Sequence, residues 1–130
     1  MRRELRIEGI ALNTVRELPL EDQDALLRFG SPISFAIGSA TILAEFNRYG
    51  GELRVNLAHI DGGGEGVLLA LWKLVRTYAE ERGFDAIRWN VHALTCAEPN
   101  PKLQRFLAAN GFAEVDDAQY GRIFMRRQML

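Results

Sequence analysis

The chain has 130 residues, 48% of them hydrophobic and 25% charged, and a formal net charge of -1 at pH 7. This composition is typical of a single globular domain with a hydrophobic core, and the near-zero net charge gives no general attraction to nucleic acid or to an anionic membrane. The single Cys96 excludes an internal disulfide, and the longest apolar run, residues 67–72, is too short to span a bilayer, so we expect a cytoplasmic protein of one domain, residues 1–130.

The first part of the chain predicts a strand, a helix and a strand hairpin. Residues 5–15 alternate loosely and contain β-branched side chains, which is typical of a strand. Pro19 and the acidic residues after it predict a short helix that ends at Gly30. The apolar residues 33–46 are interrupted at Gly38, which favours two strands joined by a tight turn.

A strand, a helix and a second strand follow around a glycine-rich loop. Residues 52–60 alternate between apolar and polar side chains and predict a strand, and the loop GGGEG comes directly after it. Apolar residues at helical spacing then predict an amphipathic helix that ends at Gly83. Residues 84–93 predict the next strand. A unit of this length is most simply a right-handed crossover between parallel neighbours, and we expect Trp72 and Trp89 to lie in its core.

The end of the chain predicts one more helix and a strand hairpin. Asn100 is suited to cap a helix that has Pro101 at its first position and Gly111 as its stop. We then expect two strands, residues 112–115 and 122–127, around a loop that contains Asp116 and Asp117.

These linked spacings resemble the GCN5-related N-acetyltransferase (GNAT) family over roughly the last 80 residues. The motifs that carry the resemblance are a strand end, a helix end and a helix that closes with Gly-Phe. The strand end is Ala58-His59-Ile60-Asp61, and the helix end is Tyr78-Ala79-Glu80-Glu81-Arg82-Gly83. The last helix carries Asn100, Leu103, Phe106, Gly111 and Phe112 at the family's spacing.

The resemblance implies an α/β (α+β) fold with a mixed sheet, a central parallel strand pair joined by a crossover helix, helices on both faces, and an N-terminal helical region shortened to one helix. It implies transfer of acetyl from acetyl-CoA, the co-substrate, to a primary amine. The shortened helical part would leave the acceptor groove open on one side, which favours the amine of a protein or peptide over a tightly enclosed metabolite. A homodimer is compatible with such a fold.

The resemblance also assigns the cofactor contacts. The glycine loop and the helix start would hold the pyrophosphate, and the strand end would pair with the pantetheine arm. The implied residues are Ala58, His59, Ile60, Gly62, Gly63, Gly64, Glu65, Gly66, Val67, Leu68, Asn100 and Phe106. The loop departs from the family pattern, because Gly63 and Leu68 occupy two of its three signature positions. It also contains no Lys or Arg, so its carboxylates oppose an anionic ligand.

Acetyl transfer to an amine needs a base, donors for an oxyanion and an acid for the thiolate. The candidate base is Glu52, from its place at the start of a strand, or His59, from the titration range of histidine. The family's tyrosine acid is replaced by Leu107, so Tyr120 or Cys96 is the substitute candidate. Each of these residues also has a plain structural explanation as a solvated or packing residue, and capping alone explains Asn100.

Two other functions stay open beside the enzyme. The altered loop and Leu107 are compatible with a GNAT-fold module that binds acyl-CoA or regulates a partner without turnover. A domain that keeps only the fold and binds another protein is the third option. We expect no metal site, because no His and Cys residues have metal-ligand spacing, and we interpret His92 as a hydrogen-bonded residue at a strand rim.

Overall fold

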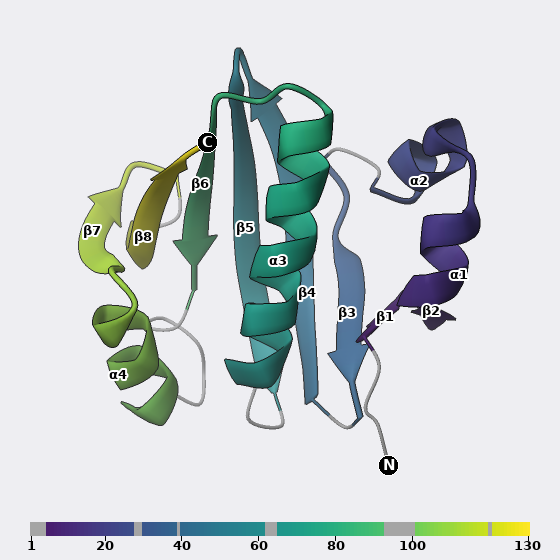
Figure 1. Cartoon of the computed structure of the whole chain (residues 1–130). Coiled ribbons are helices and arrows are strands. Elements are labelled where there is room, and N and C mark those ends of the chain that lie inside the picture. The colour runs from purple at the N-terminus through teal and green to yellow at the C-terminus, as the bar shows by residue number, and fades with distance from the viewer. Residues whose placement is uncertain (1–4, 28–29, 39, 62–64, 93–100, 120) are drawn as a thin grey trace.

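The computed structural model describes residues 5–27, 30–38, 40–61, 65–92, 101–119 and 121–130. In these residues one mixed sheet of eight strands is accompanied by four helices (Figure 1). The elements in chain order are β1 (Leu5–Ile7), β2 (Ile10–Ala11), α1 (Leu12–Glu17), α2 (Leu20–Leu27), β3 (Ile33–Ile37), β4 (Ala40–Tyr49), β5 (Glu52–Asp61), α3 (Glu65–Glu81), β6 (Ala86–Val91), α4 (Pro101–Ala109), β7 (Ala113–Asp117) and β8 (Gly121–Met129).

The sheet has the order β2-β1-β3-β4-β5-β6-β8-β7. Strands β5 and β6 are parallel, with Glu52 opposite Ala86 and Leu57 opposite Val91, while the other neighbouring pairs are antiparallel. Helix α3 connects the parallel strands, which confirms the crossover that the sequence predicts.

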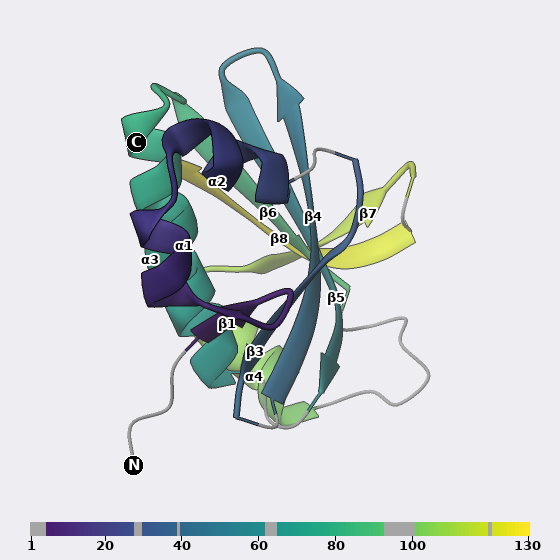
Figure 2. The same cartoon turned by 90° about the vertical axis from the view of Figure 1, so that its right-hand side faces the viewer.

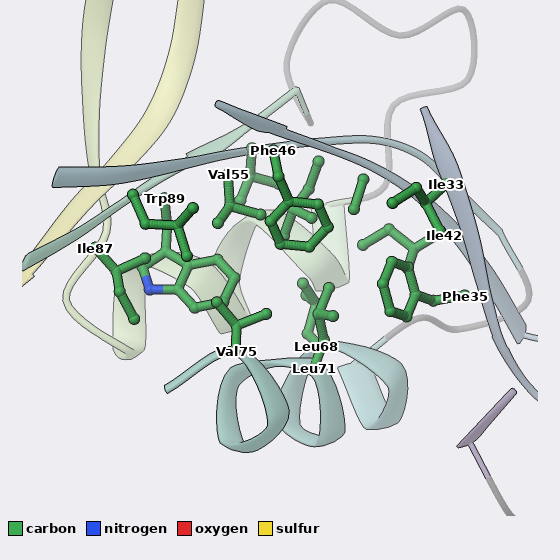
Figure 3. Packing of buried hydrophobic residues seen from close by; sticks show 14 of the residues in the cluster. Ile33, Phe35, Ile42, Phe46, Val55, Leu68, Leu71, Val75, Ile87 and Trp89 are labelled. Atoms are coloured by element: carbon green, nitrogen blue, oxygen red, sulfur yellow. The ribbon is translucent and has the colours of Figure 1, made fainter. Parts of the chain in front are cut away.

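Helix α3 packs its apolar side against the middle of the sheet. Leu68, Leu71 and Val75 point toward Phe46, Val55 and Trp89 of the strands (Figure 3). The three-and-four spacing along α3 puts its apolar residues on one side, and the alternation along β5 puts alternate residues toward the same core. The buried set includes Leu53, Val55, Leu57, Leu68, Leu71, Ile87 and Trp89. One face of the sheet is therefore covered, and the polar residues of β5 lie on the other face.

The N-terminal prediction was partly wrong. Residues 5–15 do not form one strand, because Glu8 and Gly9 have φ values of 51° and 80° and make a two-residue hairpin turn between β1 and β2. The chain then enters α1, so the N-terminal region has two short helices and not one. Helices α1 and α2 lie on the same side of the sheet as α3 (Figure 2).

The C-terminal prediction needs one correction. Asp116 and Asp117 are the last residues of β7 and do not form a loop. Asp116 stands opposite Arg122 in β8, and the guanidinium of Arg122 lies 3.2 Å from its carboxylate. Such opposite-charge pairs across two strands favour strand pairing, which periodicity of apolar residues alone does not reveal.

Helices α3 and α4 end where glycines were predicted to stop them, with φ values of 75° at Gly83 and 85° at Gly111. Among the described helices, none is both long enough and apolar enough to cross a membrane.

Candidate functional site

Strands β5 and β6 separate before β5 ends. Their last paired residues are Leu57 and Val91, and the backbone N–H of His92 then donates to the carbonyl of Leu57 at 2.9 Å. Strand β5 continues to Asp61, and Figure 1 shows it running on beyond the arrowhead of β6. In the part of the chain that is described, residues 58–61 have no strand partner on the β6 side. This segment therefore presents an open backbone edge.

A bulge in β5 accompanies this separation. Leu43 of β4 stands opposite Ala58, and the next pair is Thr41 with Asp61. Two steps along β4 thus correspond to three steps along β5, so β5 carries one extra residue. A bulge bends a strand and increases its local twist, which gives a physical reason for β5 to turn away from β6 at this point.

The open edge leads toward the start of α3. Helix α3 begins at Glu65, four residues after β5 ends, and Gly66 lies in its first turn. The first N–H groups of a helix have no partner within the helix and carry its positive dipole end. An extended backbone edge and a set of helix N–H donors thus follow one another along the chain.

A polar pocket lies on the sheet face opposite α3. It has a volume of about 230 Å³ and is lined by Tyr49, Arg54, Asn56, Asn90, Asp117, Ala118 and Gln119. These residues come from four strands and from the turn after β7. The pocket reaches the position just before the strand separation, because Asn56 and Asn90 stand opposite each other on β5 and β6.

Asn56 and Asn90 form the floor of this polar pocket. The side-chain amide of Asn90 donates to the side-chain oxygen of Asn56 at 2.9 Å, and both residues are buried. The Nε of Arg88 donates to Asn90 at 3.2 Å, and the same guanidinium contacts Asp117 at 3.3 Å. Buried amides need such partners, so the bonds fix the floor in one arrangement.

Glu52 lies at the far end of β5 from the open edge. Ala58 lies six positions further along the strand, which corresponds to about 20 Å. Its carboxylate lies 2.8 Å from Arg54 and 2.9 Å from Arg127. Burial raises the pKa of Glu52, but the hydrogen bonds and charges of the two arginines outweigh it and leave the pKa below its ordinary value. A carboxylate in this state is a poor proton acceptor.

His92, which the sequence predicted only as a hydrogen-bonded residue at a strand rim, is a better placed titratable group. It follows the last residue of β6 at the strand separation and is half-buried. Burial lowers the pKa of His92, and the negative charge of Asp117 raises it by less, so the net shift is downward. His92 is therefore neutral at pH 7 and can accept a proton. The sequence signal was its even spacing from Arg88 and Asn90, which puts it on the polar face.

The other predicted site residues fall into four sets. Ala58, His59 and Ile60 form the open backbone edge of β5, which brings three predicted cofactor contacts together. Leu68 is fully buried against the core, and Phe106 of α4 stacks on Trp72 with ring centroids 5.9 Å apart. Glu65, Gly66 and Val67 form the first turn of α3. Gly62, Gly63, Gly64, Cys96, Asn100 and Tyr120 lie outside the described residues.

The position of the family's tyrosine offers no acid. Leu107 has no exposed surface and belongs to the core cluster. Across the described residues, no three His, Cys, Asp or Glu side chains gather as a metal site would require.

A second pocket lies on the covered face, between α1, α2 and α3. Its volume is about 390 Å³, and most of its lining is aliphatic or aromatic, including Val15, Phe35, Phe46 and Leu74. It lies under the N-terminal helices and does not include residues of the strand separation. Of these two pockets, the polar pocket lies nearer to the open edge, because Asn56 and Asn90 directly precede the strand separation.

No protein-family model matches the chain, and no curated protein matches its sequence. Its structure is similar to that of Ard1 from Thermoplasma volcanium, with 15% identity, a TM-score of 0.53, and 98% of each chain covered. It is also similar to an acetyltransferase of the GNAT family from Staphylococcus aureus Mu50, with 15% identity, a TM-score of 0.51, and 95% of this chain and 98% of that chain covered. The chain has the GNAT fold, as expected from its sequence.

Proposed function

We propose that this protein is an N-acyltransferase that transfers acetyl from acetyl-CoA to a primary amine. The observation that carries the proposal is the separation of the parallel strands β5 and β6 beside the start of α3. The amides of a pantetheine arm can pair with an open strand edge as an added strand does, and helix N–H groups favour phosphates. The fold, which is shared with a GNAT acetyltransferase, supports the same activity.

The residues present fit acetyl-CoA through their backbone. Residues 58–61 would hold the pantetheine arm, and Gly66 with its neighbours at the start of α3 would hold the pyrophosphate. The loop carboxylates Asp61 and Glu65 weaken this site without removing its donors. When bound, acetyl-CoA supplies an activated acetyl group.

His92 is our proposed base. Its neutral imidazole takes the proton of the acceptor amine, and Asp117 stabilises the imidazolium that results. His59 remains a second candidate from its place in the open edge. Because Leu107 is buried, α4 supplies no acid, and Tyr120 stays the proposed proton donor.

One observation favours a second function, that of an acyl-CoA-binding module without turnover. The buried Leu107 stands where the family has the tyrosine that donates a proton to the departing thiolate. The two functions share the cofactor site and differ in the release of free CoA thiol when amines are added.

The first test is calorimetric titration of the protein with acetyl-CoA and with CoA. The Gly66→Glu variant adds a carboxylate in the first turn of α3, and Thr77→Glu adds the same charge about three turns further along the helix. We expect micromolar binding that Gly66→Glu abolishes and Thr77→Glu leaves unchanged.

Absence of heat and of thermal stabilisation at millimolar acetyl-CoA would exclude both the enzyme and the acyl-CoA-binding module. Equal affinity in the two glutamate variants would place the ligand away from the start of α3. Binding without release of thiol over a wide amine screen would favour the module.

A further inference from the structure

From the polar pocket we infer that the amine acceptor is a small amino carboxylate, one molecule that carries both the acylated amine and a carboxylate group. This inference rests on the proposed function for the role of the pocket. The binding of an amino carboxylate to the pocket can still be measured without acetyl-CoA.

The carboxylate partner is Arg54. Its Nε donates to Glu52 at 2.8 Å, and its guanidinium lies over the ring of Tyr49, 4.0 Å from the centroid. Within the described chain, no hydrogen bond is made by its two terminal amino groups. Arg54 lines the polar pocket, so these donors are available to a ligand there. A guanidinium fixed in this way is suited to bind a carboxylate through two parallel hydrogen bonds.

The opposite wall of the polar pocket is acidic. Asp117 lines it, and its side chain is only 18% exposed. Its carboxylate already accepts from Arg88 at 3.3 Å and from the backbone N–H of Gln119 at 2.8 Å. Because Asp117 lines the pocket, an ammonium group bound there would lie near its negative charge. The negative charge of Asp117 also raises the pKa of His92, so the acidic wall influences the proposed base.

The space between the two walls selects a compact polar molecule. The amides of Asn56 and Asn90 form the floor, and the volume of about 230 Å³ lies below the usual range of drug-sized sites. A cationic wall, an acidic wall and amides between them match a zwitterion of amino-acid size. A simple alkylamine would leave the donors of Arg54 without a partner.

The test compares each amino carboxylate with its own uncharged counterpart. Release of CoA thiol from acetyl-CoA is followed with glycine, L-alanine, L-serine and β-alanine, and with glycinamide, L-alaninamide, L-serinamide and β-alaninamide. We expect the carboxylates to have a kcat/KM higher by about 10-fold or more, the effect of charge-assisted hydrogen bonds.

Two arginine variants form a matched pair. Arg54→Gln and Arg127→Gln each remove one guanidinium from Glu52, but Arg127 does not line the polar pocket. We expect Arg54→Gln to abolish the preference for carboxylates, Arg54→Lys to retain part of it, and Arg127→Gln to retain all of it. Amides that react as well as acids, or a preference that survives in Arg54→Gln, would overturn the inference.

Binding without acetyl-CoA separates this inference from the proposed function. The side-chain amide NMR signals of Asn56 and Asn90 are followed while each amino carboxylate is added. Shifts that saturate in the native protein and in Arg127→Gln, but not in Arg54→Gln, support the pocket even if acetyl-CoA fails to bind. Signals that no amino carboxylate shifts would contradict it even if acetyl-CoA binds well.

Discussion

His92 combines a position at the strand separation with a downward-shifted pKa, and a proton-accepting role follows from both. The active form is the neutral imidazole, so kcat/KM should rise with pH through the pKa of His92, which lies below the ordinary 6.5. We predict that His92→Gln lowers kcat/KM by about 10²- to 10⁴-fold, the usual range for general-base catalysis, and removes this rise.

The variant Asp117→Asn tests the same role of His92 by removing the charge that acts on it. Asp117 raises the pKa of His92, so its removal should move the rise of kcat/KM to lower pH. The measurement is kcat/KM from about pH 5 to about pH 9, a range that covers the titration of a histidine. An unchanged pH profile in both variants would assign the base to another residue, with His59 as the next candidate.

Asn56 and Asn90 are the buried polar pair whose loss should be most costly. Replacing only Asn90 by Leu leaves the amide of Asn56 without its donor, and we predict a loss of about 1 to 3 kcal/mol in the free energy of unfolding. The double variant Asn56→Leu/Asn90→Leu removes both groups and should cost less than the sum of the single changes. Urea denaturation of all four proteins measures this coupling, and additive values would show that the bond contributes little.

At the scale of elements, Glu52 links the start of β5 to β8. Its side chain is 15% exposed and contacts Arg54 within β5 and Arg127 from β8. Hydrogen bonds to charged groups contribute about 1.5 to 3 kcal/mol to stability, so we predict that Glu52→Gln lowers the free energy of unfolding by about this amount. The surface pair of Glu80 with Arg76 is the control, because Glu80→Gln should have almost no effect.

The pH dependence of this link has a definite sign. The folded-state pKa of Glu52 lies below its ordinary 4.5, so the stability it contributes is present above pH 4.5 and is lost as the pH falls through the folded pKa. Native protein and Glu52→Gln should therefore converge in stability at low pH. Unchanged kcat with reduced stability identifies Glu52 as structural, whereas a large fall in kcat at unchanged stability identifies it as the base.

For the whole molecule, the central part of the fold could be predicted from the sequence. The period of apolar residues and the glycine stops predict β5, α3 and α4, because each of these elements buries one regular side, and β6 follows from its short apolar run. The N-terminal region was predicted less well, because α1 has only six residues and no side-chain cap. A local pattern of this length does not distinguish a helix from a strand.

The site was less predictable than the fold, because it depends on contacts between distant residues. Glu52 and Arg127 lie 75 positions apart, and Arg88 and Asp117 lie 29 apart. Nothing local in the sequence indicates that Glu52 is held by two guanidinium groups or that the charge of Asp117 raises the pKa of His92. The separation of β5 from β6 depends on a bulge, which alternation alone cannot locate.

The charge of the whole protein matters for how it would bind a polyanion such as acetyl-CoA. The net charge of -1 gives no long-range attraction, so local charges matter most, and the sequence has the carboxylates Asp61 and Glu65 at or near the start of α3. We predict that Asp61→Asn/Glu65→Gln tightens acetyl-CoA binding by about 3- to 30-fold, from about 0.3 to 1 kcal/mol for each charge at a helix start. The gain should shrink at high ionic strength, because salt screens exposed charges.

The control for this change is Glu80→Gln/Glu81→Gln at the end of α3. It alters the net charge by the same amount, but its carboxylates lie at the opposite end of the 17-residue helix. Calorimetry at low and high salt should therefore show a salt-dependent gain in affinity for the first double variant and none for the second. Equal gains in both would indicate a response to net charge, and no gain in either would move the pyrophosphate away from the start of α3.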